Sequence, residues 1–278
     1  MFLPDRDFFI KEKRVLLTRA GRERVRSSKI TGTKIPFFFD LKYSPFMSWA
    51  RINNFYEISK DPKAWERYLI NIEFKIRGFV NDEINMDFKG YSPDRCNVFD
   101  HEVFGGVPDG EEFDANGKVT SILEIKTPHW KKPNTVDIYE FLLQLGLYLY
   151  LRNLDEGYLC VAFLGMGEVW KRKDEHLDLF LTDFTELEPF FKVGRWDTLL
   201  PSQWKEFNNS PFGFDILESK KYTNSKYEIH LMKVKIDMEK YGAIMKKFEN
   251  WYWKHKHESP DLDVNQDTQF VKEAWNGH

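Results

Sequence analysis

The segment from His101 to Pro128, HEVFGGVPDGEEFDANGKVTSILEIKTP, constrains the fold more than any other part of the chain. It contains two short apolar stretches joined by a polar loop with Asn116 and Gly117, a dipeptide that favours the positive φ angles of a tight turn. Pro128 ends the second stretch because proline has no N–H to donate to a sheet. The pattern predicts a β-hairpin whose first strand runs through VFGGV and ends at Asp109.

Helices and further strands are expected on both sides of this hairpin, from the spacing of apolar residues and from capping residues. The expected elements are helical turns from about Thr33 to Ile58, a helix over 63–84 opened by Asp61 and Pro62, a helix over 136–154 capped by Asn134 or Thr135, strands over 158–166, near 177–184 and over 227–237, and a helix over 238–256. Helix-flanked strands predict an α/β (α+β) fold with a central mixed β-sheet.

The chain has no internal repeat, low-complexity tract or linker rich in Pro, Gly and Ser. Apolar residues make up 42% of it, which excludes a disordered or fibrous class. We therefore expect a single domain over 1–278, with a core over about 20–165 and a C-terminal strand-and-helix extension over about 166–278. The tail after Ser259 is polar and is expected to fray.

Several functional classes are excluded by composition. No run approaches the roughly 18 apolar residues that a membrane span requires, and the longest, FLLQLGLYLYL, is interrupted by Gln144 and Gly146. The N-terminus lacks the basic-then-apolar order of a secretory signal, so a soluble, cytoplasmic protein without a membrane partner is expected. Cys96 and Cys160 are too few for a four-thiolate zinc or iron-sulfur site, and both are expected to be reduced.

The charge pattern bears on nucleic-acid binding. The formal net charge is −3, which excludes a uniformly basic DNA-binding protein. Residues 1–34 nevertheless contain ten basic and four acidic residues, a local balance of +6. This region is either a solvated charged face or a local surface for a polyanion.

One Asp/Glu-x-Lys triplet stands out among six in the chain. Only Glu124 to Lys126 lies on an apolar strand, where alternation places Glu124 and Lys126 on one face and Leu123 and Ile125 on the other. The hairpin would bring Asp109 beside Glu124. The sequence therefore predicts that two carboxylates and an ammonium converge.

These three groups suit metal-assisted hydrolysis of a phosphodiester. Magnesium prefers oxygen ligands and takes one or two carboxylates together with waters and a phosphate oxygen, which Asp109 and Glu124 can satisfy. Lys126 can orient the attacking water or neutralise the phosphate. A second Mg²⁺ would assist the leaving 3′ oxygen when DNA is bound, and Mn²⁺ is expected to substitute. The alternative is a surface ion pair between Glu124 and Lys126 with an unrelated turn aspartate.

Glu73 is a candidate third carboxylate. It lies on the helix over 63–84, whose apolar positions Ile70, Phe74 and Phe79 are expected to face a core. Glu73 either reaches the metal cluster or is an exposed helix charge.

Gln144 is a candidate supporting residue. It interrupts an apolar helix face formed with Phe141, Leu145 and Tyr148, and an unpaired buried amide would cost about 1 to 3 kcal/mol. Its partner is therefore expected to be polar: either a buried backbone group, or the active-site lysine, water or the DNA backbone.

Taken together, these motifs resemble the PD-(D/E)XK nuclease superfamily, and most closely its lambda-exonuclease and YqaJ-type viral recombinase branch. The motifs are Glu73, the PD of Pro108 and Asp109, the EIK of Glu124 to Lys126, and QLGLYLY from Gln144. The resemblance implies a restriction-endonuclease-like core. It also implies that Glu73, Asp109, Glu124 and the backbone carbonyl of Ile125 bind magnesium, that Lys126 serves the nucleophilic water, and that Gln144 assists.

A second motif, RSSKITGT from Arg26 to Thr33, resembles the Arg-x-x-x-Ile-Thr-small-Ser/Thr element of the same branch. That resemblance implies that Arg26 and Thr33, with Thr31 beside them, hold a DNA phosphate, notably the 5′ phosphate of the digested strand. Arginine binds phosphate through two parallel hydrogen bonds, which suits this role. The alternative is an ordinary helix cap with a solvated arginine.

Three functions remain open at this point. The first is an exonuclease that digests duplex DNA from a 5′ end for phage-type or mobile-element recombination, with a single-strand annealing protein as partner and a possible homo-oligomer. The second is an endonuclease for defence or DNA processing, and the third is a non-catalytic DNA-binding protein. The resemblance covers about Arg24 to Gly165. His101 and His129 flank the motifs and are expected to be loop residues.

Overall fold

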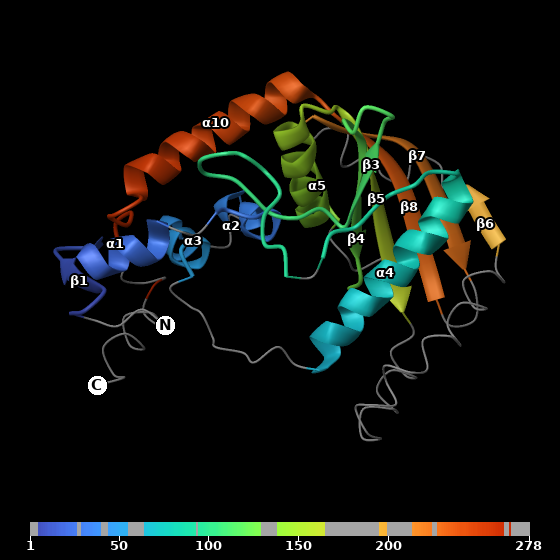
Figure 1. The fold of residues 1–278 in the computed structure, drawn as a ribbon. Coiled ribbons are helices and arrows are strands. Elements are labelled where there is room, and N and C mark those ends of the chain that lie inside the picture. The colour runs from blue at the N-terminus through green and yellow to red at the C-terminus, as the bar shows by residue number, and fades with distance from the viewer. Residues whose placement is uncertain are drawn as a thin grey trace. The chain divides into compact units, whose positions relative to one another are not determined.

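The computed structural model describes residues 5–26, 29–39, 44–54, 64–92, 94–128, 138–164, 195–198, 213–223, 227–263 and 267. These residues form two compact units (Figure 1). Unit 1 comprises Met1–Lys60, Phe99–Gly106 and Gly242–His278, and unit 2 comprises Asp61–Val98 and Val107–Tyr241.

Unit 2 is built on a six-stranded mixed sheet with the strand order β3-β4-β5-β8-β7-β6. Strands β4 and β5 are parallel, and every other neighbouring pair is antiparallel. The strands are β3 (Gly110–Phe113), β4 (Val119–Lys126), β5 (Glu156–Leu164), β6 (Arg195–Thr198), β7 (Phe214–Thr223) and β8 (Tyr227–Ile236). Helices flank this sheet, so the predicted α/β class with a central mixed sheet is confirmed.

Two helices cover opposite faces of the sheet (Figure 1). Helix α4 (Ala64–Ile84) packs its buried residues on the face that carries Leu123 and Ile125. Helix α5 (Tyr139–Arg152) lies on the other face, where its leucines approach Gly157 so closely that a Cβ there would lie 2.9 Å from Leu149. Strand alternation therefore points Glu124 and Lys126 away from the face that α4 covers.

The buried face of α4 differs from the expected one. Ile76, Phe79 and Val80 are buried, as predicted for Phe79, whereas Phe74 is 62% exposed. At about 100° per residue, position 74 lies roughly 200° around the helix from Ile76, and so on its opposite side. The expectation that Phe74 faces the core is wrong, and the side chain of Ile70 and the capping residues Asp61 and Pro62 lie outside the described residues.

The predicted hairpin is present, but its first strand is GEEF rather than VFGGV. Gly110 pairs with Leu123 and Glu111 with Ile122, so Asp109 precedes β3 instead of ending a strand. The VFGGV stretch cannot join this hairpin because Ile30 donates to the carbonyl of Val103 and accepts from Gly105 within unit 1.

The turn of the hairpin follows the expected chemistry. Gly117 has a φ of +78°, and the Asp114 carboxylate accepts hydrogen bonds from the backbone N–H groups of Asn116 and Lys118. These contacts close the turn beside the pair Phe113 and Val119, and a β-bulge between Glu112 and Phe113 then shifts the pairing by one residue, which leaves Asp109 opposite Glu124.

The C-terminal half of the chain contributes to the same sheet. Strand β8 lies between β5 and β7, so residues far beyond 165 belong to the same sheet as β4 and β5. The strands expected over 158–166 and 227–237 correspond to β5 and β8, and the last expected helix is α10 (Met238–His255). The strand expected near 177–184 and the caps Asn134 and Thr135 lie outside the described residues.

Unit 1 combines a hairpin with short helices. Its elements are β1 (Phe8–Lys11), β2 (Arg14–Leu17), α1 (Arg19–Arg26), a 3-10 turn η1 (Gly32–Lys34), α2 (Ile35–Phe39), α3 (Pro45–Ile52) and most of α10. Ser44 caps α3 by accepting a hydrogen bond from the N–H of Met47. The helical turns expected from Thr33 are confirmed in η1, α2 and α3, and residues 40–43 and 55–58 lie outside the described residues.

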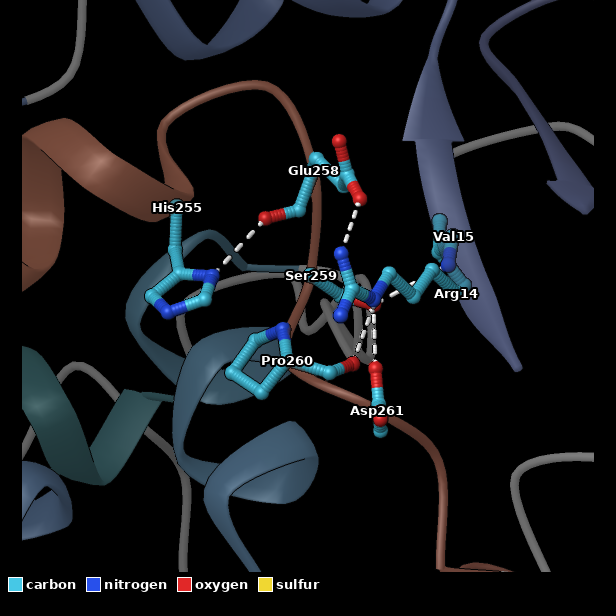
Figure 2. Close-up of polar contacts among 7 residues, drawn as sticks. All are labelled: Arg14, Val15, His255, Glu258, Ser259, Pro260 and Asp261. Carbon is cyan, nitrogen blue, oxygen red and sulfur yellow. Dashed lines mark hydrogen bonds and ion pairs between the residues drawn. The ribbon is translucent and has the colours of Figure 1, made fainter. Parts of the chain in front are cut away.

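The segment after α10 runs along β2 (Figure 2). Ser259 exchanges hydrogen bonds with Val15: the Val15 N–H donates to Oγ of Ser259, and the Ser259 N–H donates to the carbonyl of Val15, each at 2.9 Å. Arg14 pairs with both Glu258 and Asp261. Beyond Ser259, Pro260 and Leu262 are buried and the Leu262 N–H donates to the carbonyl of Lys13, so the expectation of a frayed tail after Ser259 is wrong for residues 260–263.

Two exclusions from composition can be compared with the structure. No helix within the described residues is long and apolar enough to cross a membrane. Cys96 is exposed and Cys160 is buried, and both are free thiols.

Candidate active site

The carboxylate of Asp109 is attached to strand β4. Asp109 lies directly before β3, opposite Glu124 in the register of the hairpin, and its Oδ2 accepts a hydrogen bond of 2.7 Å from the N–H of Ile125. The backbone N–H and C=O of a strand residue point to the same side, so the Ile125 carbonyl faces the same edge as this bond. The hairpin thus brings together two of the predicted metal-binding groups.

Glu124 and Lys126 form a largely buried ion pair. The Lys126 ammonium donates to Oε1 of Glu124, and the two side chains are 20% and 1% exposed, respectively. The second oxygen, Oε2 of Glu124, is buried and has no hydrogen-bond partner among the described residues. A buried carboxylate oxygen without a donor is costly, and it is the feature of this site that most needs a ligand.

The carboxylates of the site have raised pKa values. Burial, followed by the charge of Asp109, raises the pKa of Glu124 to about 8, against the opposing effect of Lys126. Burial also raises the pKa of Asp109. If all these carboxyl groups were ionised, they would carry more negative charge than Lys126 neutralises, so they keep protons to a higher pH, and an added cation would stabilise the ionised forms.

Glu73 is close enough to interact with this group. It is half-buried on α4, in line with Ile76 and Val80, and not an exposed helix charge. Burial and the charge of Asp109 raise its pKa to about 7, while Lys126 lowers it. Even so, no three His, Cys, Asp or Glu side chains in the described part of the chain are arranged as a ready metal-binding group.

Gln144 has a partner that was not expected from the sequence. It is buried, and its Nε2 donates to the hydroxyl of Tyr148 one turn later, at 3.4 Å. This is neither a backbone group nor Lys126, and the length indicates a weak bond. The partner of the amide nitrogen is therefore the hydroxyl of a tyrosine that was counted among the apolar residues of this helix face.

The proposed phosphate-binding residues belong to unit 1. The hydroxyls of Thr31 and Thr33 lie 3.0 Å apart at the start of η1, and Thr33 is exposed. Arg26 is the last residue of α1, and its side chain lies outside the described residues. His101 is a loop residue, as expected, and its Nδ1 accepts hydrogen bonds from the N–H groups of Val103 and Phe104. His129 lies outside the described residues.

Arg77 also lies at the site, although the sequence analysis does not single it out. Its Nη1 donates a hydrogen bond of 2.7 Å to the backbone carbonyl of Asp109. Burial lowers the pKa of its guanidinium, against the opposite effect of Asp109 and Glu73. The sequence signal that could have found it is its place four residues after Glu73, on the same side of the helix.

Comparisons with known proteins give relatives but no activity. No protein-family model matches the chain. It is 27% identical to the uncharacterized protein MG373 of Mycoplasma genitalium, over 96% of this chain and 95% of the relative. It is also 29% identical to a homologue of that protein in Mycoplasma pneumoniae, over 57% of this chain and 73% of the relative.

Among solved structures, an alkaline exonuclease from Laribacter hongkongensis matches 62% of this chain and 95% of its own, with 14% sequence identity and a TM-score of 0.36. That TM-score is too low to assign a fold or an activity to this chain.

Proposed function

We propose that this protein is a metal-dependent deoxyribonuclease that hydrolyses phosphodiester bonds at the Asp109, Glu124 and Lys126 group. The observation that carries this proposal is the buried Oε2 of Glu124, which has no described partner and lies on a carboxylate already close to Asp109 and Lys126. A surface ion pair would not bury this oxygen. The motif resemblance supports the same chemistry.

Magnesium fits the groups that the site offers. This ion is commonly held by one or two carboxylates, waters and a substrate phosphate, so a preformed group of three acidic side chains is not required. Asp109, Glu124 and the carbonyl of Ile125 would hold it, with Glu73 nearby. When bound, the ion supplies Lewis-acid stabilisation of the negative charge that develops on the phosphate.

Lys126 acts in this proposal as a cation. Burial lowers its pKa, but Glu124 and Asp109 outweigh burial, and the pKa is raised overall. The ammonium therefore keeps its proton at neutral pH, and it can orient a water molecule or neutralise a phosphate oxygen. It is poorly suited to removing a proton from water.

The finer proposal is an exonuclease that recognises 5′ ends of duplex DNA for phage-type or mobile-element recombination. Arg26, Thr31 and Thr33 would hold the 5′ phosphate, Gln144 would support the site, and a single-strand annealing protein would be the partner. Two Mg²⁺ ions would act when DNA is bound, and Mn²⁺ would substitute. These points rest on the motif resemblance alone.

The decisive experiment is digestion of linear duplexes labelled separately at each 5′ and 3′ end, with and without Mg²⁺. We expect Mg²⁺-dependent release of the 5′ label by the native protein, and a loss of about a hundredfold or more in Lys126→Ala, because a charge that stabilises the transition state is removed. A closed circular duplex is the control, since cutting it would indicate an endonuclease. If duplex, single-stranded DNA and RNA all remain intact with Mg²⁺, the protein is a non-catalytic binder.

Recognition of the 5′ end is tested by Arg26→Ala. Digestion of 5′-phosphorylated duplexes should fall much more than digestion of duplexes with a 5′ hydroxyl, because only the former present the phosphate that Arg26 would hold. Equal loss on both substrates would contradict this role.

A further inference from the structure

Arg77 has a hydrogen-bonding edge that the protein itself does not use. Its Nη1 donates to the carbonyl of Asp109, and its guanidinium lies over the ring of Phe74, 5.0 Å from the ring centroid. Within the described part of the chain this is the only hydrogen bond of Arg77, so its Nε and Nη2 have no acceptor there. Arg77 is half-buried beside the proposed active site, and its Nε and Nη2 can therefore donate hydrogen bonds to a ligand.

The same edge binds oxyanions elsewhere in this protein. Arg152 donates from Nε and Nη2 to the two carboxylate oxygens of Glu111, at 2.8 and 3.1 Å. Arg6 donates from the same two atoms to Asp7, each at 3.0 Å. The Nε and Nη2 edge matches the spacing of two oxygens on a carboxylate or a phosphate. Arg77 presents this edge without a protein carboxylate on it.

Two glycines make room for the Arg77 side chain. A Cβ at Gly90 would lie 2.0 Å from its Nη1 and 2.7 Å from its Nη2, and a Cβ at Gly110 would lie 3.2 Å from its Cδ. Gly90 is not among the glycines with a positive φ, so its backbone does not demand glycine. The space that Gly90 leaves is instead filled by the guanidinium, which holds the arginine at this place.

The charges around Arg77 also favour an anionic ligand from outside the protein. Lys126 already forms an ion pair with Glu124, whereas Arg77 forms no ion pair with a carboxylate in the described residues. An arginine remains charged at all physiological pH values. A strand of DNA approaching Asp109 and Glu124 would bring a phosphate to a site where the protein's own carboxylates repel it, and Arg77 offers a compensating cation.

We propose that Arg77 binds a backbone phosphate of the DNA strand held at the active site, through its Nε and Nη2. This inference rests on the proposed nuclease function and adds a substrate-binding residue to it. Arg77 belongs to neither the PD, the EIK nor the RSSKITGT motif.

The test measures DNA binding without cleavage, by fluorescence anisotropy of a labelled duplex with Ca²⁺ in place of Mg²⁺, at several salt concentrations. Arg77→Gln should weaken binding roughly tenfold or more and reduce the slope of log affinity against log salt by about 0.9, the contribution of one phosphate contact. Arg77→Lys keeps the charge but loses the fork, so it should weaken binding while retaining the slope. Thermal unfolding of each variant verifies that it is folded.

A matched pair of glycine variants tests the space beside Gly90 that the Arg77 guanidinium fills, without changing any charge. Gly90→Ala should displace the guanidinium and weaken DNA binding as Arg77→Gln does. Gly78→Ala lies on the exposed side of α4, where a Cβ would meet nothing within 4 Å, and it should leave binding unchanged. Equal binding by Gly90→Ala and the native protein would contradict the claim that the space beside Gly90 positions Arg77 for DNA binding.

A duplex series with one uncharged methylphosphonate at each successive position identifies the phosphate. At the position that Arg77 binds, the substitution should weaken binding by the native protein but not by Arg77→Gln, a non-additive result that a purely structural role would not give. If the native protein cleaves DNA and Arg77→Gln matches its affinity, salt slope and methylphosphonate profile, only this inference fails. If the native protein neither binds nor cleaves DNA, the proposed function fails, and the inference fails with it.

Discussion

At the scale of single residues, Glu124 is where burial and charge conflict most directly. Its carboxylate is 1% exposed, shares one lysine with nearby Asp109, and leaves Oε2 without a described partner. An enzyme site commonly keeps such a group at a cost in stability, because the ligand removes the conflict. This cost leads to two measurable consequences.

The first consequence is a dependence of stability on pH in the metal-free protein. The pKa of Glu124 is about 8 in the folded state against an ordinary value of 4.5, so between these pH values the unfolded chain has lost a proton that the folded protein keeps. Raising the pH therefore favours unfolding, by at most about 1.4 kcal/mol per pH unit for one carboxyl. Thermal unfolding in EDTA from pH 5 to 8 should show this decline, and Glu124→Gln should flatten it. The exposed Glu83→Gln on α4 should keep the native dependence.

The second consequence is the release of protons when the metal binds. At pH 7 the carboxyl groups of Glu124 and Glu73, with pKa values of about 8 and 7, are partly protonated, and a cation must displace those protons. The heat of Mg²⁺ or Mn²⁺ binding should therefore vary with the ionisation enthalpy of the buffer. The variation should be much smaller in Glu124→Gln, and an identical heat in all buffers would refute the linkage.

Sequence reasoning succeeded for this site where local rules apply. The turn at Gly117 and the alternation of Leu123, Glu124 and Ile125 are short-range features that it predicts, but it does not predict the β-bulge after Glu112 that sets Asp109 opposite Glu124. It failed where tertiary contacts decide. The exposure of Phe74 and the bond from Gln144 to Tyr148 depend on which helix face meets the sheet, and the spacing of residues alone does not fix this.

At the scale of elements, the hairpin that carries the site is anchored by a second buried ion pair. Glu111 on β3 is fully buried and accepts hydrogen bonds from Arg152, in the last turn of α5, and from Tyr91. Glu111 lies two residues after Asp109, so this pair connects the base of the site to the helix on one face of the sheet. A sequence alone gives little indication of such a contact, because its residues are 41 positions apart.

Breaking this anchor should be costly. Glu111→Gln leaves the Arg152 charge without its partner, and we expect a loss of about 3 kcal/mol in the free energy of unfolding, measured with urea. The neighbouring Glu112→Gln is the control, because that partly exposed side chain contacts Thr120, and it should change stability by no more than about 0.5 kcal/mol. Similar effects of both variants would show that the ion pair does not anchor β3.

At the scale of the whole molecule, the chain builds part of unit 1, then most of unit 2, and then returns to unit 1. The interruption of unit 1 by unit 2 is therefore a long-range feature of the chain. Local patterns identify strands such as β8, but they do not reveal that β8 inserts between β5 and β7 or that residues near 259 pair with Val15.

Removal of residues 258–278 tests whether the C-terminal segment completes unit 1 by pairing with β2. The truncated chain lacks the backbone bonds from Ser259 to Val15, so amide hydrogen exchange should become fast in β2 while β4 and β5 remain protected. Arg14→Ala is the control, because it removes only exposed ion pairs and should leave β2 protected. Retained protection of β2 in the truncated chain would contradict the pairing.

The pairing of β2 with the segment after α10 also has a consequence for synthesis on the ribosome. Leu17 bonds to the carbonyl of His257, so about 240 residues must be added before this strand meets its neighbour. At 5 to 20 residues per second this takes on the order of 10 to 50 s. During that interval all strands of the six-stranded sheet can already leave the ribosome, because β8 ends at Ile236. One edge of the first hairpin remains unpaired until His257 follows, and a chaperone can bind that edge.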